Sequence, residues 1–335
     1  MNSRDIILAN LNRTDPPRPG MNFEGGGRMD DFAVFWPHKS GLFQQKRWVE
    51  GDLEYFDDEW GGLWSRLVGG CERGEICKPM LEDWAQLPDL HLPEGNTPQR
   101  VAAIQTFFAG APAGAFKLAV NCWVFEVSRY LRKMEVYFED MALYPDELHE
   151  LHAKVAVVCE GRIRAAAAAG ADGIFILEDL GTQQNLLFSP AMFREYFKPL
   201  YTRLIGITHE LGMKFFMHSC GQNSQILDDL MDCGVDCFQF DQPTVYDMPA
   251  LAAKLKSRKV ALWAPVDIQK VLPTGDRAFI EAETRHMINL FRGGLILKNY
   301  PDLHGIGVKE EWDNWAYQTM LREMDTQTGD TADGM

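Results

Sequence analysis

Long apolar runs are missing from this sequence: nowhere do about 18 apolar residues follow one another, the length that a membrane-spanning helix needs. Basic residues are also scarce, because 33 lysines and arginines face 48 aspartates and glutamates, for a formal net charge of −15. So negative a chain repels phosphate backbones and anionic lipid, and we expect neither nucleic acid nor a membrane surface as its partner. The first residues lack the features of a targeting segment and favour an amphipathic helix with Ile6, Ile7 and Leu11 facing inward.

Cysteines are few and odd in number, with 7 among 335 residues. A chain of this size can build a hydrophobic core without disulfides, so these thiols indicate a reducing compartment, and we expect a cytoplasmic protein. A glycine-rich phosphate loop after an early strand is absent, which leaves nucleotide binding without support. The content of 46% hydrophobic and 24% charged residues is ordinary for a globular protein and excludes intrinsic disorder.

Hydrophobic patterning differs between the two ends of the chain. Residues 1–110 are rich in loops and aromatic side chains, whereas after residue 115 short apolar runs alternate with longer helical patterns. That alternation is typical of βα units that build a mostly parallel sheet. The expected strands are 116–121, 173–177, 213–217, 237–240, 260–264 and 295–298.

With one or two earlier strands, 19–23 among them, the number approaches the eight strands of a (β/α)8 barrel. We therefore predict one barrel domain over residues 1–324. In this domain an elaborated, loop-rich N-terminal region extends to about residue 110, and regular βα units occupy 115–324. An open, doubly wound sheet is the alternative fold. The polar, acidic residues 325–335 are predicted to form a disordered tail.

Polar side chains follow nearly every predicted strand. Because function in a parallel barrel collects at the carboxyl ends of the strands, these side chains are candidates for one shared site. In chain order they are Asn121, Trp123, Glu178, Asp179, His218, Cys220, Asp241, Asp267, Tyr300 and His304. Glu178, Asp179 and Asp267 are the candidates for catalytic roles, with loop capping as the alternative for each carboxylate. Asn121 and Trp123 are candidates for the substrate pocket, with packing between the layers as their alternative.

His218 and Cys220 form the strongest local signal. In extended backbone, residues two apart project to the same face, so an imidazole and a thiolate can reach one ion. Zinc accepts this pair of nitrogen and sulfur ligands and is usually four-coordinate. A buried cysteine beside a hydrogen-bonded histidine is the alternative that this short spacing leaves open.

The stretch 170–243 (GADGIFILEDLGTQQNLLFSPAMFREYFKPLY…HELGMKFFMHSCGQ…ILDDLMDCGVDCFQFDQP) resembles the uroporphyrinogen decarboxylase superfamily, and more narrowly its branch of corrinoid-dependent methyltransferases. The opening MNSRDIILANLN and the segments 58–61 and 293–297 fit the same superfamily. The resemblance implies a (β/α)8 barrel. Decarboxylases of the superfamily hold the substrate's carboxylates with arginines in an N-terminal segment. The corresponding region here, 19–28, has one arginine together with Glu24, which argues against a porphyrinogen substrate.

The resemblance also implies zinc held by a His-x-Cys pair, which His218 and Cys220 match, and by a later cysteine. No cysteine follows Cys237, and the corresponding loop offers Asp302 and His304 instead. The implied metal set is therefore His218, Cys220 and His304 with a carboxylate, either Asp241 or Glu178.

These observations lead to one functional hypothesis. The protein would use zinc as a Lewis acid to move a methyl group from a small methylated, O-methyl substrate to the cobalt of a separate corrinoid protein. Residues expected to contact the substrate are Glu24, Asn121, Trp123, Gln183 and Tyr300. The alternatives are a metal-independent decarboxylase or lyase acting on a small acid, and a non-catalytic barrel that binds a tetrapyrrole. A homodimer is left open by the sequence.

Overall fold

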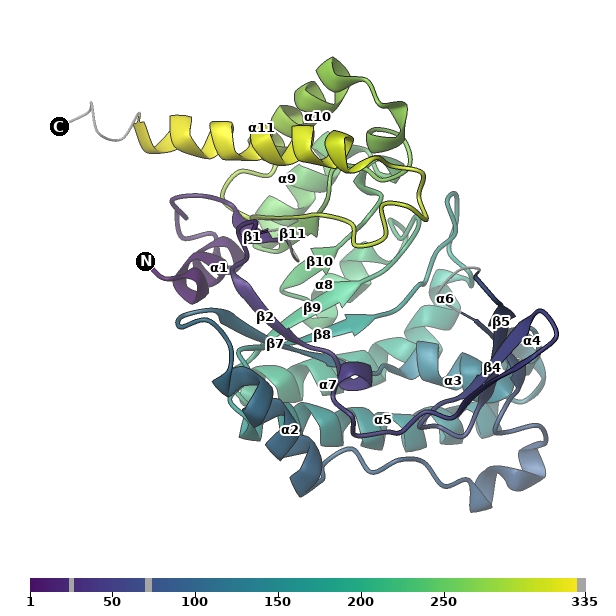
Figure 1. The fold of residues 1–335 in the computed structure, drawn as a ribbon. Helices are drawn as coiled ribbons and strands as arrows, with labels where there is room; N and C mark the ends of the chain where they lie inside the picture. The colour runs from purple at the N-terminus through teal and green to yellow at the C-terminus, as the bar shows by residue number, and fades with distance from the viewer. Residues whose placement is uncertain (24–26, 70–73, 330–335) are drawn as a thin grey trace.

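Eight parallel strands form the central sheet of the computed structural model, which describes residues 1–23, 27–69 and 74–329. The strands follow the order β1-β12-β11-β10-β9-β8-β7-β2, and helices cover the outside of the nearly closed barrel (Figure 1). The strand bounds are β1 Gly20–Asn22, β2 Phe32–Phe35, β7 Phe116–Asn121, β8 Gly173–Leu177, β9 Lys214–His218, β10 Cys237–Gln239, β11 Ala261–Ala264 and β12 Leu295–Lys298. The prediction of a (β/α)8 barrel is confirmed, and the open doubly wound sheet is excluded.

The barrel closes between β1 and β2 through one buried carboxylate, that of Asp31. This side chain is 1% exposed and accepts hydrogen bonds from the Met21 amide at 2.8 Å and from the Arg18 guanidinium, twice at 2.7 Å. The Asp31 amide donates to the Met21 carbonyl at 2.8 Å, and the Asp31 carbonyl accepts from the Phe116 amide at 2.8 Å. One residue therefore connects β1, the start of β2 and the start of β7.

Helices follow most of the strands. Their bounds are α1 Ser3–Asn12, α2 Pro98–Ala109, α3 Val124–Arg132, α4 Met134–Leu143, α5 Pro145–Ala168, α6 Pro190–Met192, α7 Lys198–Glu210, α8 Leu227–Cys233, α9 Met248–Arg258, α10 Arg277–Leu290 and α11 Glu310–Gly329. A π-helical turn at Phe193–Phe197 joins α6 to α7. Helix α11 continues to Gly329, so the predicted tail begins inside this helix, and residues 330–335 lie outside the described part of the chain.

A second, antiparallel sheet occupies part of the region predicted to be loops. Its strands, in the order β3-β4-β5-β6, are Arg47–Glu50, Leu53–Asp57, Leu63–Leu67 and Glu75–Lys78. The sequence does not predict this sheet, because its strands are short and mostly exposed and lack the alternation of a half-buried strand. Strand β5 contacts the barrel through Trp64, whose ring lies 4.7 Å from that of Tyr130 on α3. Figure 1 shows the sheet beside α3 and α4.

Aromatic side chains fill the barrel interior. Phe32 stacks on Trp263 with ring centroids 5.3 Å apart, and Phe116 and Phe216 pack edge-on within the same cluster. Helix α1 packs against the same interior and buries Ile7 completely, as its amphipathic pattern predicts. Within the described residues, none of the helices combines the length and the apolar character needed to cross a membrane.

Replacing Asp31 with alanine is expected to lower the free energy of unfolding by about 3–5 kcal/mol, because the half-buried guanidinium of Arg18 and the buried Met21 amide then lack their partner. The matched control is Asp232→Ala, which removes a carboxylate that pairs with Arg258 at the surface and is expected to cost about 1 kcal/mol or less. Urea unfolding followed by tryptophan fluorescence measures both. Equal losses of unfolding free energy in the two variants would show that Asp31 does not stabilise the junction between β1 and β2.

His152 on α5 should make stability depend on pH. Burial lowers the pKa of His152 to about 3, and its Nε2 lies 2.8 Å from the Tyr137 hydroxyl. The unfolded chain takes up this proton near pH 6.5 and the folded chain does not, so stability is complete above pH 6.5 and is lost as pH falls toward 3. Between pH 7 and pH 5 we expect a loss of about 2 kcal/mol that His152→Gln abolishes. Urea unfolding of both proteins at the two pH values tests this, and equal losses would contradict it.

Candidate metal and substrate site

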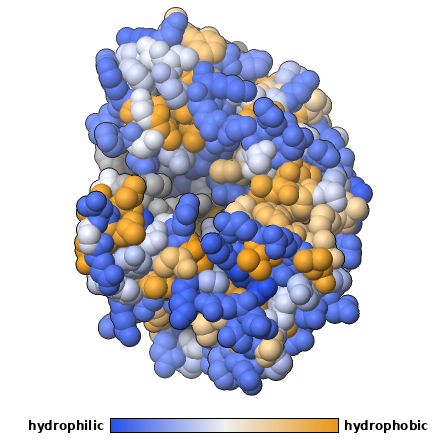
Figure 2. Space-filling view, turned by 90° about the vertical axis from the view of Figure 1, so that its right-hand side faces the viewer, coloured by the Kyte–Doolittle hydropathy of each residue, from blue (hydrophilic) through white to orange (hydrophobic). Residues whose placement is uncertain are grey.

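A cavity of about 500 Å³ lies at the carboxyl ends of the barrel strands, and we call it the barrel cavity. Trp263 and Phe175, two members of the aromatic cluster in the barrel interior, belong to the lining of this cavity. The polar part of the lining comes from strand ends and the loops after them: Asn22, His38, Asp179, His218, Cys220, Gln239, Asp241, Lys298, Asn299, Tyr300 and Asp302. Figure 2 shows a recess in the side of the molecule toward which β8 points, bordered by hydrophilic and hydrophobic residues. The predicted gathering of polar groups at this end of the barrel therefore exists as one cavity.

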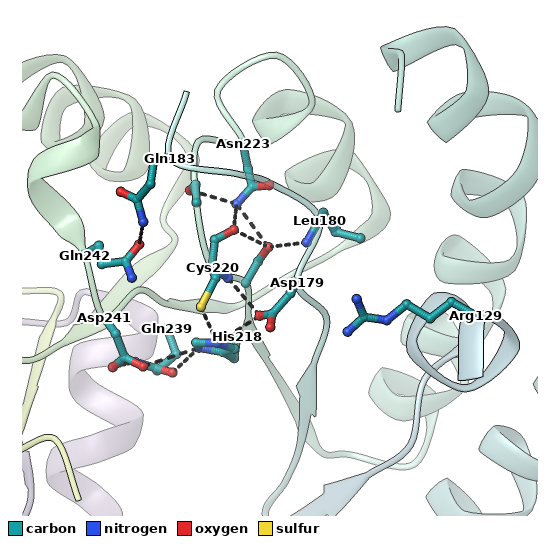
Figure 3. A network of polar contacts seen from close by, with 12 residues as sticks. Arg129, Asp179, Leu180, Gln183, His218, Cys220, Asn223, Gln239, Asp241 and Gln242 are labelled. Atoms are coloured by element: carbon teal, nitrogen blue, oxygen red, sulfur yellow. Dashed lines mark hydrogen bonds and ion pairs between the residues drawn. The ribbon is translucent and has the colours of Figure 1, made fainter. Parts of the chain in front are cut away.

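His218, the last residue of β9, is buried and held through both ring nitrogens. Its Nδ1 lies 2.5 Å from the amide oxygen of Gln239, which can only accept, so Nδ1 carries a proton and donates it. Gln239 is oriented in turn because its amide nitrogen donates to Asp241 at 2.7 Å. The other ring nitrogen, Nε2, points toward Cys220 and Asp179 (Figure 3). In the neutral imidazole this nitrogen carries the lone pair that a metal needs.

Cys220 is positioned by the loop that follows β9. Gly221 has φ of +79°, and a Cβ there would lie 2.4 Å from the Gly181 backbone, so the loop requires glycine. The buried Asn223 side chain donates to the Ser219 hydroxyl at 3.0 Å and to the Cys220 carbonyl at 3.2 Å, which fixes the backbone on both sides of the thiol (Figure 3). The Cys220 thiol consequently sits 3.4 Å from His218 Nε2.

Asp179 completes the cluster from the loop after β8. Its carboxylate oxygen lies 3.2 Å from His218 Nε2 and accepts a hydrogen bond from the Cys220 amide at 3.1 Å. One ligand atom from each of the three residues lies within 4.8 Å of the others, the arrangement expected of a small metal site. A nitrogen and a sulfur donor at the end of β9 and an oxygen donor after β8 suit zinc and leave one position of a tetrahedron for a further ligand. The residues present therefore fit a zinc ion.

The neighbours of His218 and Asp241 favour the charged forms of both side chains. Burial disfavours the charged form of His218, but the carboxylate of Asp179, the Cys220 thiol and the charge of Asp241 together raise its pKa well above the usual value. Burial would likewise raise the pKa of Asp241, but Lys298, whose Nζ lies 3.0 Å away, and then His218 lower it below its usual value. A metal cation at Nε2 would take the place of the proton that Asp179 and Cys220 stabilise there.

The other two predicted metal ligands lie apart from this cluster. Asp241 is on the Nδ1 side of His218, 3.9 Å from that atom, and pairs with Lys298. His304 is exposed in the loop after β12. Among the described residues, neither belongs to the group whose donor atoms lie within 4.8 Å of one another. Asp179, which the sequence suggests as a catalytic residue, lies beside His218 and Cys220 instead.

The two remaining catalytic candidates have buried carboxylates with protein partners. Glu178 accepts from the Tyr201 hydroxyl at 2.5 Å and from the Glu126 amide at 3.0 Å, and burial raises its pKa to about 8 despite these bonds. Asp267 accepts from the Thr244 hydroxyl at 2.6 Å and also from backbone amides, which is the loop-capping alternative.

The five predicted substrate contacts are spread over different surroundings. Tyr300 lines the barrel cavity. Gln183 is exposed and donates to the Gln242 side chain at 3.2 Å (Figure 3). Asn121 donates to a backbone carbonyl of α5 and borders a neighbouring cavity, while Trp123 is fully buried in the core. Glu24 lies outside the described residues.

Sequence reasoning missed Gln239, Lys298 and Trp36. Gln239 and Lys298 are the last residues of buried strands and therefore look like continuations of them. Gln239 precedes Asp241 by two residues on the same strand end, so alternation predicts that both point the same way, and this signal was available. Trp36 follows β2, a strand that the sequence did not delimit.

A (β/α)8 barrel with a His/Cys/Asp cluster at the carboxyl ends of its strands defines a class of protein, the barrels that carry a candidate metal site at this end. Residues 78–299 of the chain match the family described as uroporphyrinogen decarboxylase (URO-D). The chain belongs to this family, as the resemblance of stretch 170–243 predicts.

Two proteins of Methanosarcina mazei are similar to the chain. A methylated-thiol–coenzyme M methyltransferase is 26% identical over 132 residues, and the match covers 39% of this chain but only 33% of that protein. The solved structure of a methyltransferase has a TM-score of 0.62 at 16% identity, covering 80% of this chain and 76% of that one. The structural likeness shows a shared fold.

We expect purified protein, loaded with zinc and desalted, to retain about one zinc per chain. His218→Ala and Asp179→Asn should reduce this content strongly, because each removes one donor of the cluster. His304→Ala is the matched control, since it removes an exposed histidine that does not belong to the cluster. Elemental analysis at equal protein concentration gives the result. Zinc lost in His304→Ala but kept in His218→Ala would place the metal elsewhere.

Proposed function

We propose that the chain is a zinc-dependent methyltransferase that moves a methyl group from a small O-methyl substrate to the cobalt of a corrinoid protein. One observation carries the proposal: His218, Cys220 and Asp179 converge inside a cavity at the catalytic end of the barrel. Similarity to a methyltransferase that acts on methylated thiols supports methyl transfer as the reaction class, although the match covers a third of that protein.

His218 Nε2, Cys220 Sγ and a carboxylate oxygen of Asp179 would hold the zinc ion. The bound ion would supply a Lewis acid that stabilises the negative charge of the oxygen from which the methyl group departs. Gln239 would keep the imidazole in the tautomer that exposes Nε2, because its amide oxygen accepts the Nδ1 proton. The loop geometry imposed by Gly221 and Asn223 would keep the thiol on the same side.

Lys298 places a second positive charge in the barrel cavity. Its Nζ pairs with Asp241, and its side chain is 12% exposed, so it borders the cavity without being freely solvated. A methyl ether has a poor leaving group, and a cation near the departing oxygen lowers the cost of the charge that develops there. Lys298 would therefore orient the leaving oxygen and could pass a proton to it from Nζ.

The recess at this end gives the methyl acceptor a route to the site (Figure 2). The apolar side chains of Trp263 and Phe175 would exclude water from the reacting methyl group. We propose that the corrinoid protein approaches over the same face, since the opposite end of the barrel is packed by α1.

The test is anaerobic incubation of zinc-loaded protein with cob(I)alamin and a panel of O-methyl and S-methyl compounds, with methylcobalamin followed by absorbance. We expect methyl transfer from at least one O-methyl compound, and a rate lower by about 100-fold or more in His218→Ala, since a Lewis acid worth several kcal/mol is lost. His286→Ala, an exposed histidine on α10, should keep the wild-type rate.

Other outcomes separate the alternatives. Turnover of a small acid by metal-free protein would favour a decarboxylase or lyase, in which carboxylates move the proton. Tight tetrapyrrole binding that survives His218→Ala, without turnover of any compound, would favour a binding protein. Transfer restricted to S-methyl compounds would retain the methyltransferase and reject the O-methyl substrate.

A further inference from the structure

A second cavity, of about 420 Å³, adjoins the barrel cavity on the side of the antiparallel sheet. We call it the arginine cavity because Arg100 and Arg162 belong to its lining. The linings of the two cavities share Trp36, His38 and Leu177, so the cavities lie side by side. The sequence gives no motif for this cavity, because its residues come from α2, α5, the end of β7 and the turn after β4.

Arg100 on α2 and Arg162 on α5 are both buried, with 6% of each residue exposed. The guanidinium groups share one carboxylate: Glu59 lies 3.4 Å from Arg100 and 2.7 Å from Arg162. The Nε atoms of both arginines have no hydrogen-bond partner in the described part of the chain. Within the described ranges, both of these buried cations pair with Glu59, so two positive charges share one anion.

Two other carboxylates line the same cavity. Asp58 is occupied by its own turn, where it accepts from the Trp60 and Gly62 amides at 2.9 Å and from the Trp64 indole at 2.6 Å. Burial raises the pKa of Asp58, which reduces its negative charge further. Glu126, on the first turn of α3, has an interaction of its own. Glu59 is the carboxylate on this wall that pairs with both arginines.

A purely structural role would explain part of this arrangement. Glu59 precedes Trp60, and the Arg162 guanidinium lies 5.1 Å from the Trp60 ring centroid, so one arginine anchors this turn to the barrel. A second buried guanidinium on the same carboxylate adds desolvation cost, because burial of a charge without a full partner is unfavourable. Burial accordingly lowers the pKa of Arg100. An anion in the cavity would offset that cost.

We propose that the arginine cavity binds the carboxylate of an anionic methyl donor through Arg100 and Arg162, while the methylated end reaches the barrel cavity. The part concerning the methyl donor rests on the proposed function. Anion binding itself rests only on the two arginines and their cavity. Planar guanidinium groups suit a carboxylate because they can donate two parallel hydrogen bonds to it.

Cys122, which follows β7, provides a reporter inside this cavity. Its thiol is half-buried, borders the arginine cavity and lies 3.6 Å from the thiol of the fully buried Cys159. Iodoacetate and iodoacetamide both alkylate a thiolate, with the C–S bond forming as the C–I bond breaks and iodide leaving. The two reagents have nearly the same size, but only iodoacetate carries a carboxylate. Their rate ratio therefore measures whether the cavity attracts an anion.

The experiment measures both alkylation rates at Cys122 by peptide mass spectrometry in the whole protein. Cys77, an exposed cysteine of β6, serves as the internal reference. We expect the iodoacetate-to-iodoacetamide ratio at Cys122 to exceed that at Cys77 by about threefold or more at low salt, and the excess to shrink as salt screens the arginines. A ratio equal to or below that at Cys77, or no reaction of Cys122 with either reagent, would overturn the proposal.

Variants separate local charge from net charge. Arg100→Gln should bring the Cys122 ratio close to the Cys77 ratio, whereas Arg100→Lys should retain most of the excess. Arg258→Gln is the matched control, because it removes the same charge from an exposed surface pair on α9. Since the comparison of the two cysteines uses the wild-type protein, it stands even if Arg100→Gln does not fold.

The readout does not involve methyl transfer, so the two proposals fail separately. An excess at Cys122 without methyl transfer would keep the anion site and reject the methyltransferase. Methyl transfer without an excess at Cys122 would keep the methyltransferase and reject the anion site.

Discussion

Closure of the eight-stranded sheet is the constraint on which the other features depend. The seam between β1 and β2 is joined by Asp31, a buried carboxylate that takes hydrogen bonds from Arg18 and Met21. Closure makes the strand interiors face one another, so that Phe32 can stack on Trp263 across the barrel. The same closure brings all the carboxyl strand ends around one opening, which creates the barrel cavity.

Within that opening the polar side chains are largely shielded from solvent, so they depend on one another for hydrogen bonds and for charge compensation. Gln239 holds one ring nitrogen of His218 and leaves the other directed at Cys220 and Asp179. On the Nδ1 side of His218, the positive charge of Lys298 lowers the pKa of Asp241 and favours its ionised form. Buried charges in such a network are stabilised by one another, and removing one leaves another without compensation.

The N-terminal region adds an antiparallel sheet and part of the wall of a second cavity to the barrel. The antiparallel sheet and the turn after β4 bring Glu59 and Trp60 against α5, which builds the wall of a second cavity beside the first. A ligand that spans both cavities would meet the His/Cys/Asp cluster at one end and Arg100 and Arg162 at the other. Both arginines belong to helices of the barrel, and the added segment supplies Glu59 and Trp60 to the same wall.

The sequence by itself determined the barrel, seven of its strands (19–23 included), and the His218–Cys220 pair, because these depend on local periodicity and on spacing within one strand. It also drew attention to Asp179 as a strand-end carboxylate. Only the tertiary structure decided that Asp179, rather than Asp241 or His304, lies beside the pair. Likewise, the loops around Trp123 and Glu178 turn those side chains into the core. Which strand-end residues meet depends on loop paths and strand register, and these are set by packing between segments far apart in the chain.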